Sequence, residues 1–257
     1  MKWQIMASVA IVSLCGYVAC IQAKVQQKKP VITKRLVRWQ STGDSASATQ
    51  LTKDTAGHIT LVENNTEINT FRYVGDSILL TEYAKEAGRV VYSFRGLTDS
   101  TGKLLQGTAI AAYGSFAPDT VLHRFEYNKE GYLVRESREY GAAGTYTISY
   151  EYDGRDVVRI LTWYNNELNN TKELGYYSDK ANTTGLEDLK FRHNINNLVG
   201  RNSEHLIKTI SSANGKGKLN YAFTYEYETD AEGLPVKLIA KKGKQVKAVT
   251  TYYYAAG

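Results

Sequence analysis

Two of the four histidines are the side chains best placed in this sequence for acid–base or metal chemistry. His193 and His205 flank one segment that also contains Glu187, Asp188 and Glu204. Imidazole and carboxylate groups together can bind a metal ion or transfer protons. The separation of twelve positions between the two histidines matches no metal-site spacing, however. The sequence therefore predicts no metal site and no cofactor.

Nucleophile motifs are missing from the sequence. It contains no Gly-x-Ser-x-Gly, no Walker loop and no His-Glu-x-x-His, which are the patterns that place a nucleophile, a phosphate or a catalytic zinc ion. Both cysteines, Cys15 and Cys20, lie near the N-terminus. We therefore predict a non-enzymatic protein. A hydrolase of envelope polymers remains an alternative, because a converging pair of carboxylates cannot be read from sequence.

Cys20 is a candidate for lipid attachment. Residues 1–19 have one lysine and then an uncharged run over 5–19, which is too short for a membrane span and typical of a secretory signal peptide. Tyr17-Val18-Ala19-Cys20 resembles the bacterial lipobox, with Tyr17 in place of the usual leucine. The similarity implies that Cys20 is lipidated and anchors the chain to a membrane. Cleavage of an ordinary leader after Ala23 is the alternative.

Charge and composition limit the partners of the chain. The net charge is +6, or +5 without Lys2 of the leader, and basic residues are scattered among acidic ones. A nucleic-acid-binding protein would need a basic stripe on a recognisable module, so we predict no nucleic-acid partner. Residues 20–30 are polar and basic and predict a tether, and residues 31–257 predict a single domain.

Tyrosine is the most over-represented residue type. The chain has 20 tyrosines, and 15 of them follow residue 120. A tyrosine offers a large apolar ring with a polar tip, so a row of tyrosines can pack a sheet or stack on a ligand. The candidate ligand-binding residues are Tyr150, Tyr152, Tyr221, Tyr225 and Tyr227. Ordinary packing within the sheet is the alternative reading.

The clearest structural element is a β-hairpin over 219–239. Apolar and polar residues alternate strictly over 219–227, which places Tyr221, Tyr225 and Tyr227 on one face of a strand. The segment 228–233 is rich in turn-forming residues and ends in a glycine, and an aliphatic strand follows. This pattern positions the candidate tyrosines on one sheet face.

Weaker copies of this hairpin recur along the chain. Each has an aromatic-x-aromatic strand end, a turn with Asp or Asn and Gly, and an aliphatic return strand; the clearest copies span 125–135 and 150–161. We predict an all-β fold, an antiparallel meander of repeated hairpins that curls into an open or closed barrel-like sheet. One short helical or irregular excursion near 184–205 interrupts the pattern and would plug an open end.

The lipobox-like Cys20 followed by these hairpins resembles an uncharacterised family of Bacteroidetes lipoproteins with a porin-like antiparallel β fold. Its hairpins are similar to the YD repeats of bacterial surface proteins. The resemblance covers residues 30–257 and brings no catalytic residues. It implies a cell-envelope lipoprotein that binds an envelope glycan or a protein partner or acts as a scaffold. No acidic stretch follows Cys20, which favours an outer-membrane anchor with the domain facing the periplasm.

An integral outer-membrane β-barrel is the main structural alternative. Its strands would need about 9–11 residues with an apolar, lipid-facing side. Several of the predicted strands are shorter or more polar than this. The sequence therefore favours a lipid-anchored domain over a membrane-embedded one.

Overall fold

The computed structural model describes residues 34–43, 46–112, 119–184, 186–187 and 189–256. The first eight strands are β1 (Lys34–Gly43), β2 (Ser47–Lys53), β3 (Ile59–Glu63), β4 (Glu67–Val74), β5 (Ser77–Ala84), β6 (Arg89–Thr98), β7 (Leu104–Ala111) and β8 (Asp119–Tyr127). The next eight are β9 (Leu133–Glu139), β10 (Thr145–Asp153), β11 (Asp156–Tyr164), β12 (Glu167–Ala181), β13 (His205–Asn214), β14 (Leu219–Thr229), β15 (Pro235–Lys242) and β16 (Gln245–Ala256). Two short 3-10 helices, η1 (Gly141–Ala143) and η2 (Phe191–Asn197), complete the described elements.

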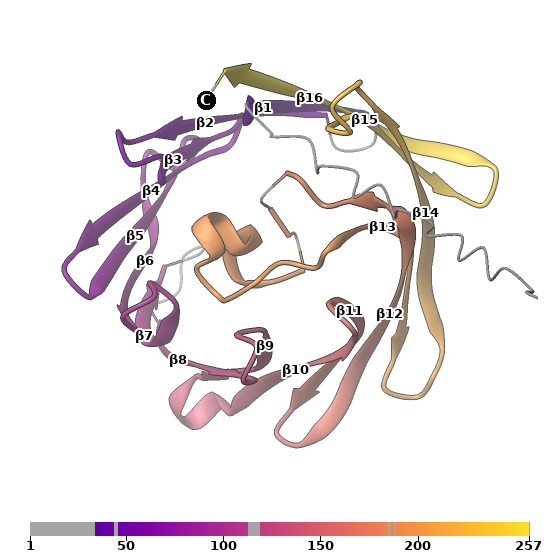
Figure 1. Cartoon of the computed structure of the whole chain (residues 1–257). Helices are drawn as coiled ribbons and strands as arrows, with labels where there is room; N and C mark the ends of the chain where they lie inside the picture. Colours follow the sequence, from indigo (N-terminus) through magenta and orange to yellow (C-terminus); the bar gives the residue numbers. More distant parts are fainter. Residues whose placement is uncertain (1–33, 44–45, 113–118, 185, 188, 257) are drawn as a thin grey trace, which may run out of the picture. The chain divides into compact units, whose positions relative to one another are not determined.

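The sixteen strands form one closed antiparallel barrel (Figure 1). Each strand pairs with its neighbours in sequence, and β1 pairs with β16, so that no sheet edge is left open. Lys34 and Ala256 pair at the end of the barrel where odd-numbered strands begin. We call this end the plug rim, because the segment between β12 and β13 that is described below leaves and re-enters the sheet there, and we call the opposite end the far rim. The predicted antiparallel meander is confirmed, in its closed form.

A single turn type recurs in five of the described connections. In the turn between β14 and β15, the Gly233 N–H donates to the carbonyl of Asp230 (3.0 Å), and the Asp230 N–H donates to the carbonyl of Leu234 (2.9 Å). Oδ1 of Asp230 accepts the N–H groups of Glu232 and Leu234. Gly233 has φ 80°, a conformation that glycine adopts readily. The turns that begin with the same geometry do so at Asp54, Asp99, Asn128, Asn214 and Asp230.

The aromatic-x-aromatic motifs join neighbouring hairpins at the plug rim. Tyr127, at the end of β8, donates its hydroxyl hydrogen to the carbonyl of Leu104, the first residue of β7 (2.6 Å). Two equivalent bonds of 2.8 Å run from Tyr152 to Leu133 and from Tyr254 to Pro235. The acceptor is in each case the first residue of the preceding strand. The second aromatic residue of the motif therefore fixes the start of the strand beside it.

The interior of the barrel is a hydrophobic core. Inward-facing side chains that are at most 1 % exposed include Ile78, Leu80, Leu104, Leu133 and Val157. They belong to one cluster with four side chains of the segment between β12 and β13, namely Phe191, Ile195, Leu198 and Val199. Hydrophobic burial and dispersion stabilise this packing. An interior filled with apolar side chains differs from the water-filled lumen of a porin.

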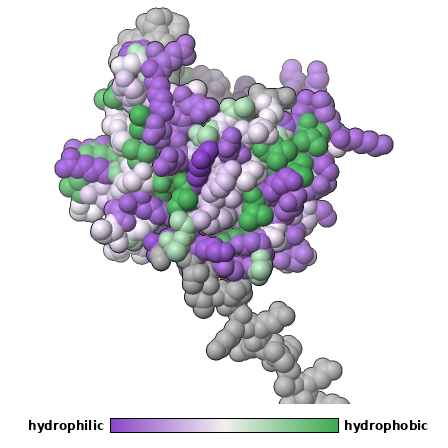
Figure 2. Space-filling model, turned by 90° about the horizontal axis from the view of Figure 1, so that it is seen from above, coloured by the Kyte–Doolittle hydropathy of each residue, from purple (hydrophilic) through white to green (hydrophobic). Residues whose placement is uncertain are grey.

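The outer wall carries ion pairs. On β10 and β11, Arg159 pairs with Glu151 (3.0 Å), and on β14 and β15, Lys237 pairs with Glu228 (2.7 Å). Further outward pairs are Lys85–Glu63, Arg124–Glu139 and Lys241–Glu226. On the face seen in Figure 2, hydrophilic residues are interspersed with hydrophobic ones and no continuous hydrophobic band is visible. The polar positions of the alternating strands therefore lie on the outside.

The segment 182–204 connects β12 to β13. Its described residues, 182–184, 186–187 and 189–204, are here called the plug and lie inside the barrel (Figure 1). Four non-glycine residues among the described part of the plug have positive φ angles: Arg192, Asn194, Asn196 and Asn197. Asparagine tolerates this conformation better than most residues, so an Asn-rich sequence suits an irregular path. The predicted excursion is confirmed, and its helical part is the seven-residue 3-10 helix η2.

One charged cluster lies within the core, away from the plug rim. The Glu136 side chain is fully buried; its Oε1 accepts a hydrogen bond from Arg138 Nε (2.6 Å) and lies 3.4 Å from Nδ1 of His123. Burial opposes ionisation, but His123 and Arg138 outweigh it and hold the pKa of Glu136 below its usual value. Glu136 is therefore charged at neutral pH and depends on these two partners.

Candidate functional site

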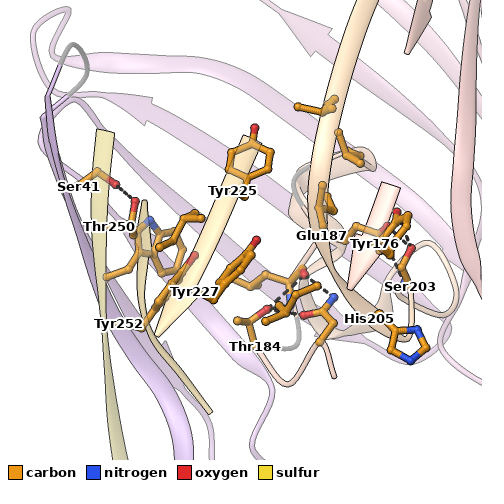
Figure 3. Close-up of a pocket in the computed structure, with 18 residues that line it drawn as sticks. Ser41, Tyr176, Thr184, Glu187, Ser203, His205, Tyr225, Tyr227, Thr250 and Tyr252 are labelled. Carbon is orange, nitrogen blue, oxygen red and sulfur yellow. Dashed lines mark hydrogen bonds between the residues drawn. The ribbon is translucent and has the colours of Figure 1, made fainter. Parts of the chain in front are cut away.

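A pocket of about 220 Å³ lies between the plug and the wall formed by β13–β16 and β1 (Figure 3). Its wall side carries mainly aromatic and aliphatic side chains, with the polar residues Ser41, Thr250 and His205 among them, and its plug side carries both apolar and polar ones. The lining residues are Trp39, Ser41, Tyr176, Asn182, Thr184, Leu186, Glu187, Leu189, Ser203, His205, Leu206, Ile207, Ile210, Tyr225, Tyr227, Leu238, Thr250 and Tyr252. This composition, mostly apolar with a few polar groups, is typical of small-molecule sites.

The plug is held by hydrogen bonds to the other half of the barrel. Asn196 accepts the N–H of Ile59 (2.9 Å) and donates to its carbonyl (3.0 Å), while Arg192 pairs with Glu82 (2.7 Å). Further backbone bonds join Leu104 to Leu198 and Arg201 to Gly131. These contacts run to β3, β5, β7 and the turn before β9. The pocket lies on the side of the plug that faces away from them.

Among the described residues that line the pocket, Glu187 is the only carboxylate, and its charge is balanced. Its Oε1 accepts the hydroxyl of Ser203 (2.7 Å), and its Oε2 accepts the Ser203 N–H (3.0 Å) and lies 2.8 Å from Nζ of Lys190. Lys190 is buried, and burial lowers its pKa although Glu187 opposes that shift. Lys190 Nζ also donates to the carbonyl of Arg201 (2.6 Å). The ion pair therefore fixes the plug backbone.

His205 and Ser203 do not form a nucleophile and base pair in the described contacts. Nδ1 of His205 lies 2.7 Å from Asp156 Oδ2, and the His205 N–H donates to Asp156 Oδ1 (2.9 Å). The Ser203 hydroxyl donates to Glu187 instead. In Figure 3 the His205 ring points away from Tyr225 and Tyr227. A serine hydrolase would need its serine within hydrogen-bond reach of the histidine, so the hydrolase alternative stays a sequence prediction.

Two of the five candidate tyrosines line the pocket. Tyr225 and Tyr227 of β14 face the plug across it (Figure 3). Tyr221 also faces inward but packs on Phe223, nearer the far rim. Tyr150 is buried, and burial raises its pKa well above the usual value. Tyr152 donates to the Leu133 carbonyl and lies under Lys190. Cys20 lies outside the described residues.

Several pocket residues were not anticipated from the sequence. Trp39 comes from β1 and Tyr252 from β16. Tyr252 belongs to an aromatic-x-aromatic motif with Tyr254, the same signal that marks Tyr225 and Tyr227. Trp39 belongs to no such motif. It reaches the pocket only because closure of the barrel brings β1 beside β16.

The remaining histidines occupy other environments. His58 is exposed and pairs with Asp54, and His123 is buried in the core. The side chain of His193 lies outside the described residues. Within the part of the chain that the structure describes, no three His, Cys, Asp or Glu side chains converge as metal ligands. None of the helical segments in the described ranges has the length and hydrophobicity of a membrane-crossing helix.

Comparison with known proteins identifies relatives by structure only. No protein-family model matches the sequence, and no curated protein matches it. The structure is similar to that of a porin-like protein from Bacteroides uniformis, with 14 % identity and a TM-score of 0.65 over 87 % of this chain and 96 % of the other. It is also similar to a porin-like protein from Bacteroides vulgatus, with 14 % identity and a TM-score of 0.64 over 86 % of this chain and 99 % of the other. The porin-like antiparallel barrel fold that the sequence resemblance implied is thereby confirmed.

Proposed function

We propose that this chain is an envelope protein whose barrel lies in water beside a membrane and holds a small ligand in the plug-side pocket. The observation that carries the proposal is the pocket itself. Its aromatic wall includes Trp39, Tyr225, Tyr227 and Tyr252. The wall faces a plug that is held to the opposite strands by hydrogen bonds and an ion pair. A rigid pocket of this kind binds without first having to be ordered.

The filled interior supports a binding role over a conducting one. The core side chains and the plug occupy the space that would be the channel of a pore. A porin has the reverse arrangement, with polar residues inside and an apolar band outside. We therefore assign the barrel no transport role.

The outer wall supports a location in water. Arg159–Glu151 and Lys237–Glu228 are exposed ion pairs on the strand faces. Each outward charge near the middle of a bilayer would cost up to about 2–4 kcal/mol. Strand length agrees, because β3 has five residues and β2 and β9 have seven each, fewer than the nine or more that a spanning strand needs. Attachment through a lipidated Cys20 would keep such a barrel at the envelope.

An integral outer-membrane barrel is the second candidate. It is favoured by the similarity to two porin-like proteins and by the even number of strands in a closed antiparallel barrel. These similarities also support association with an outer membrane in the first candidate. The two proposals differ in what holds the chain at the membrane, which is lipid on Cys20 or the barrel wall itself.

Alkaline carbonate extraction of Cys20→Ala separates the two candidates. We expect the unmodified protein to stay with the membrane fraction and the variant to appear in the carbonate-soluble fraction, because only the lipid would anchor it. A Cys15→Ala variant is the matched control and should stay with the membrane. Retention of Cys20→Ala in the membrane after carbonate would instead support the embedded barrel.

Tyr225→Ala tests the pocket. Loss of ligand affinity is expected because a ring face is removed from the wall. The measurement is thermal stabilisation of the protein by a panel of envelope glycans and amphiphiles, compared with Tyr221→Ala, which lies outside the pocket. If Tyr225→Ala loses only stability and binds as well as the unmodified protein, its role is packing.

A further inference from the structure

The plug-rim end of the pocket carries several polar side chains. Asn182, Thr184 and His205 lie at the plug rim, where β12 ends and β13 begins. Ile210 lies five residues further along β13, about 16 Å from the rim at the rise of an extended strand. Leu238 lines the wall as well. A ligand in this pocket would therefore meet polar groups at the plug rim. Deeper in the pocket it would meet Ile210 together with the paired hydroxyl groups of Ser41 and Thr250.

The polar groups inside the pocket already have partners. The hydroxyl groups of Ser41 and Thr250 face each other at 2.8 Å (Figure 3), and the Glu187 carboxylate accepts three hydrogen bonds or ion contacts. A sugar ring would bury several hydroxyl groups there, and each one needs a partner. A hydrocarbon chain needs none and gains from contact with aromatic and aliphatic walls.

The polar end of the pocket lies at the same rim as the start of β1. Lys34, the first residue of β1, pairs with Ala256 at the plug rim. Thirteen residues separate Cys20 from Lys34, so a lipid anchor on Cys20 would hold this rim within about 45 Å of the membrane surface, even with the tether fully extended. The polar end of the pocket would then lie close to the membrane, where amphiphilic molecules are concentrated.

We propose that the pocket binds a single-chain amphiphile, with its hydrocarbon chain beside Trp39 and Leu238 and its polar head at the plug rim. This inference rests on the proposed function, because it names the ligand class of the same pocket. It adds an orientation of the bound ligand, with the head at the plug rim, and a source, which is the membrane to which the chain would be tethered.

Tryptophan fluorescence tests the proposal directly. The chain has three tryptophans, Trp3, Trp39 and Trp163. Of the two that belong to the described residues, Trp39 and Trp163, only Trp39 lines the pocket. In the full chain carrying Trp3→Phe and Trp163→Phe, 11-bromoundecanoate should quench Trp39 saturably, because bromine quenches an indole that it contacts. Undecanoate, which has no bromine, should reverse the quenching by competition, and maltose should not.

Matched variants make the result specific. Trp3→Phe with Trp39→Phe leaves Trp163, which pairs with Thr147 and Leu168 rather than lining the pocket, and its fluorescence should not change. Leu238→Gln should weaken the binding about tenfold. Ile239→Gln, one residue along on the opposite face of β15, should leave it unchanged. Melting curves of both variants establish that each is folded.

The outcomes separate the two proposals. Saturable quenching of Trp39 alone supports both. Thermal stabilisation by maltose that Leu238→Gln abolishes, without quenching of Trp39, would overturn the amphiphile and keep the pocket as a binding site. Equal quenching of Trp39 and Trp163 would mean adsorption to the surface and would overturn the amphiphile inference. Neither quenching nor thermal stabilisation by any of the three compounds would overturn the binding function as well.

Discussion

The tyrosines of this barrel differ in what their hydroxyl groups contact. Tyr127, Tyr152 and Tyr254 each donate to the first carbonyl of the preceding strand. Tyr225 and Tyr227 present their rings to the pocket. A tyrosine can serve either purpose because it combines a large apolar ring with one polar atom. The position of the residue relative to the rim and the plug decides which purpose it serves.

At the scale of single residues, Glu136→Gln tests the buried charge cluster. At neutral pH the variant should be less stable by about 3 kcal/mol, because the charge that pairs with Arg138 and His123 is lost. The folded pKa of Glu136 lies below its usual 4.5. Its stabilising effect is therefore complete above pH 4.5 and is lost as the pH falls through the folded pKa. Urea unfolding at several pH values should show the two proteins converging in acid.

Glu139→Gln is the control for this prediction. Glu139 pairs with Arg124 on the outer wall at 3.1 Å, and both side chains are exposed. Exposed pairs contribute about 0–1 kcal/mol, so little change is expected. An equal loss of stability in both variants, or a Glu136→Gln difference that does not vary with pH, would contradict the assignment.

At the scale of elements, Gly233→Ala tests the recurring turn. Gly233 has φ 80°, and a Cβ added there would meet no atom within 4 Å. The cost is therefore one of backbone conformation alone, about 1–2 kcal/mol. Gly233→Asn should cost less, because asparagine visits this conformation more readily. Chemical denaturation of the two variants compares their free energies of unfolding. Equal losses would indicate that any added side chain destabilises the turn, and would contradict a cost that comes from backbone conformation.

The hairpins were predictable because their signals are local. Strict alternation places the side chains of 219–227, and the spacing of Asp230 and Gly233 specifies the turn that follows. The irregular path of 182–204 was predictable for the same reason, since it lacks alternation. The sequence did not show how the plug would be held, because Asn196 and Ile59 are 137 positions apart.

At the scale of the whole molecule, closure of the barrel and the pocket could not be predicted. Ser41 and Thr250 meet in the pocket although they are 209 positions apart. No local pattern encodes that contact, which depends on the number and tilt of all the strands between them. For this reason Tyr152 and Tyr227 carried the same sequence signal, although only Tyr227 lines the pocket.

A circular permutant tests closure. Lys34 and Ala256 are paired neighbours, so a short linker can join them, and new termini can be opened within the exposed segment Gly141–Ala143. We expect this permutant to melt cooperatively with a Tm within about 5 °C of the original. A permutant opened between Leu79 and Leu80, inside β5, should not fold. Circular dichroism distinguishes them, and failure of the first would show that closure depends on chain order.

The pairing of β1 with β16 also has a consequence for synthesis and export. A chain that emerges from its N-terminus presents β1 long before β16 (Gln245–Ala256) is available to pair with it. Until then the sheet has two unpaired edges, and such edges readily join to other chains. Contacts between residues so far apart also form slowly. The twelve residues of β16 therefore convert an aggregation-prone intermediate into a sealed one, and a chain truncated before them would be a natural target for chaperones and proteases.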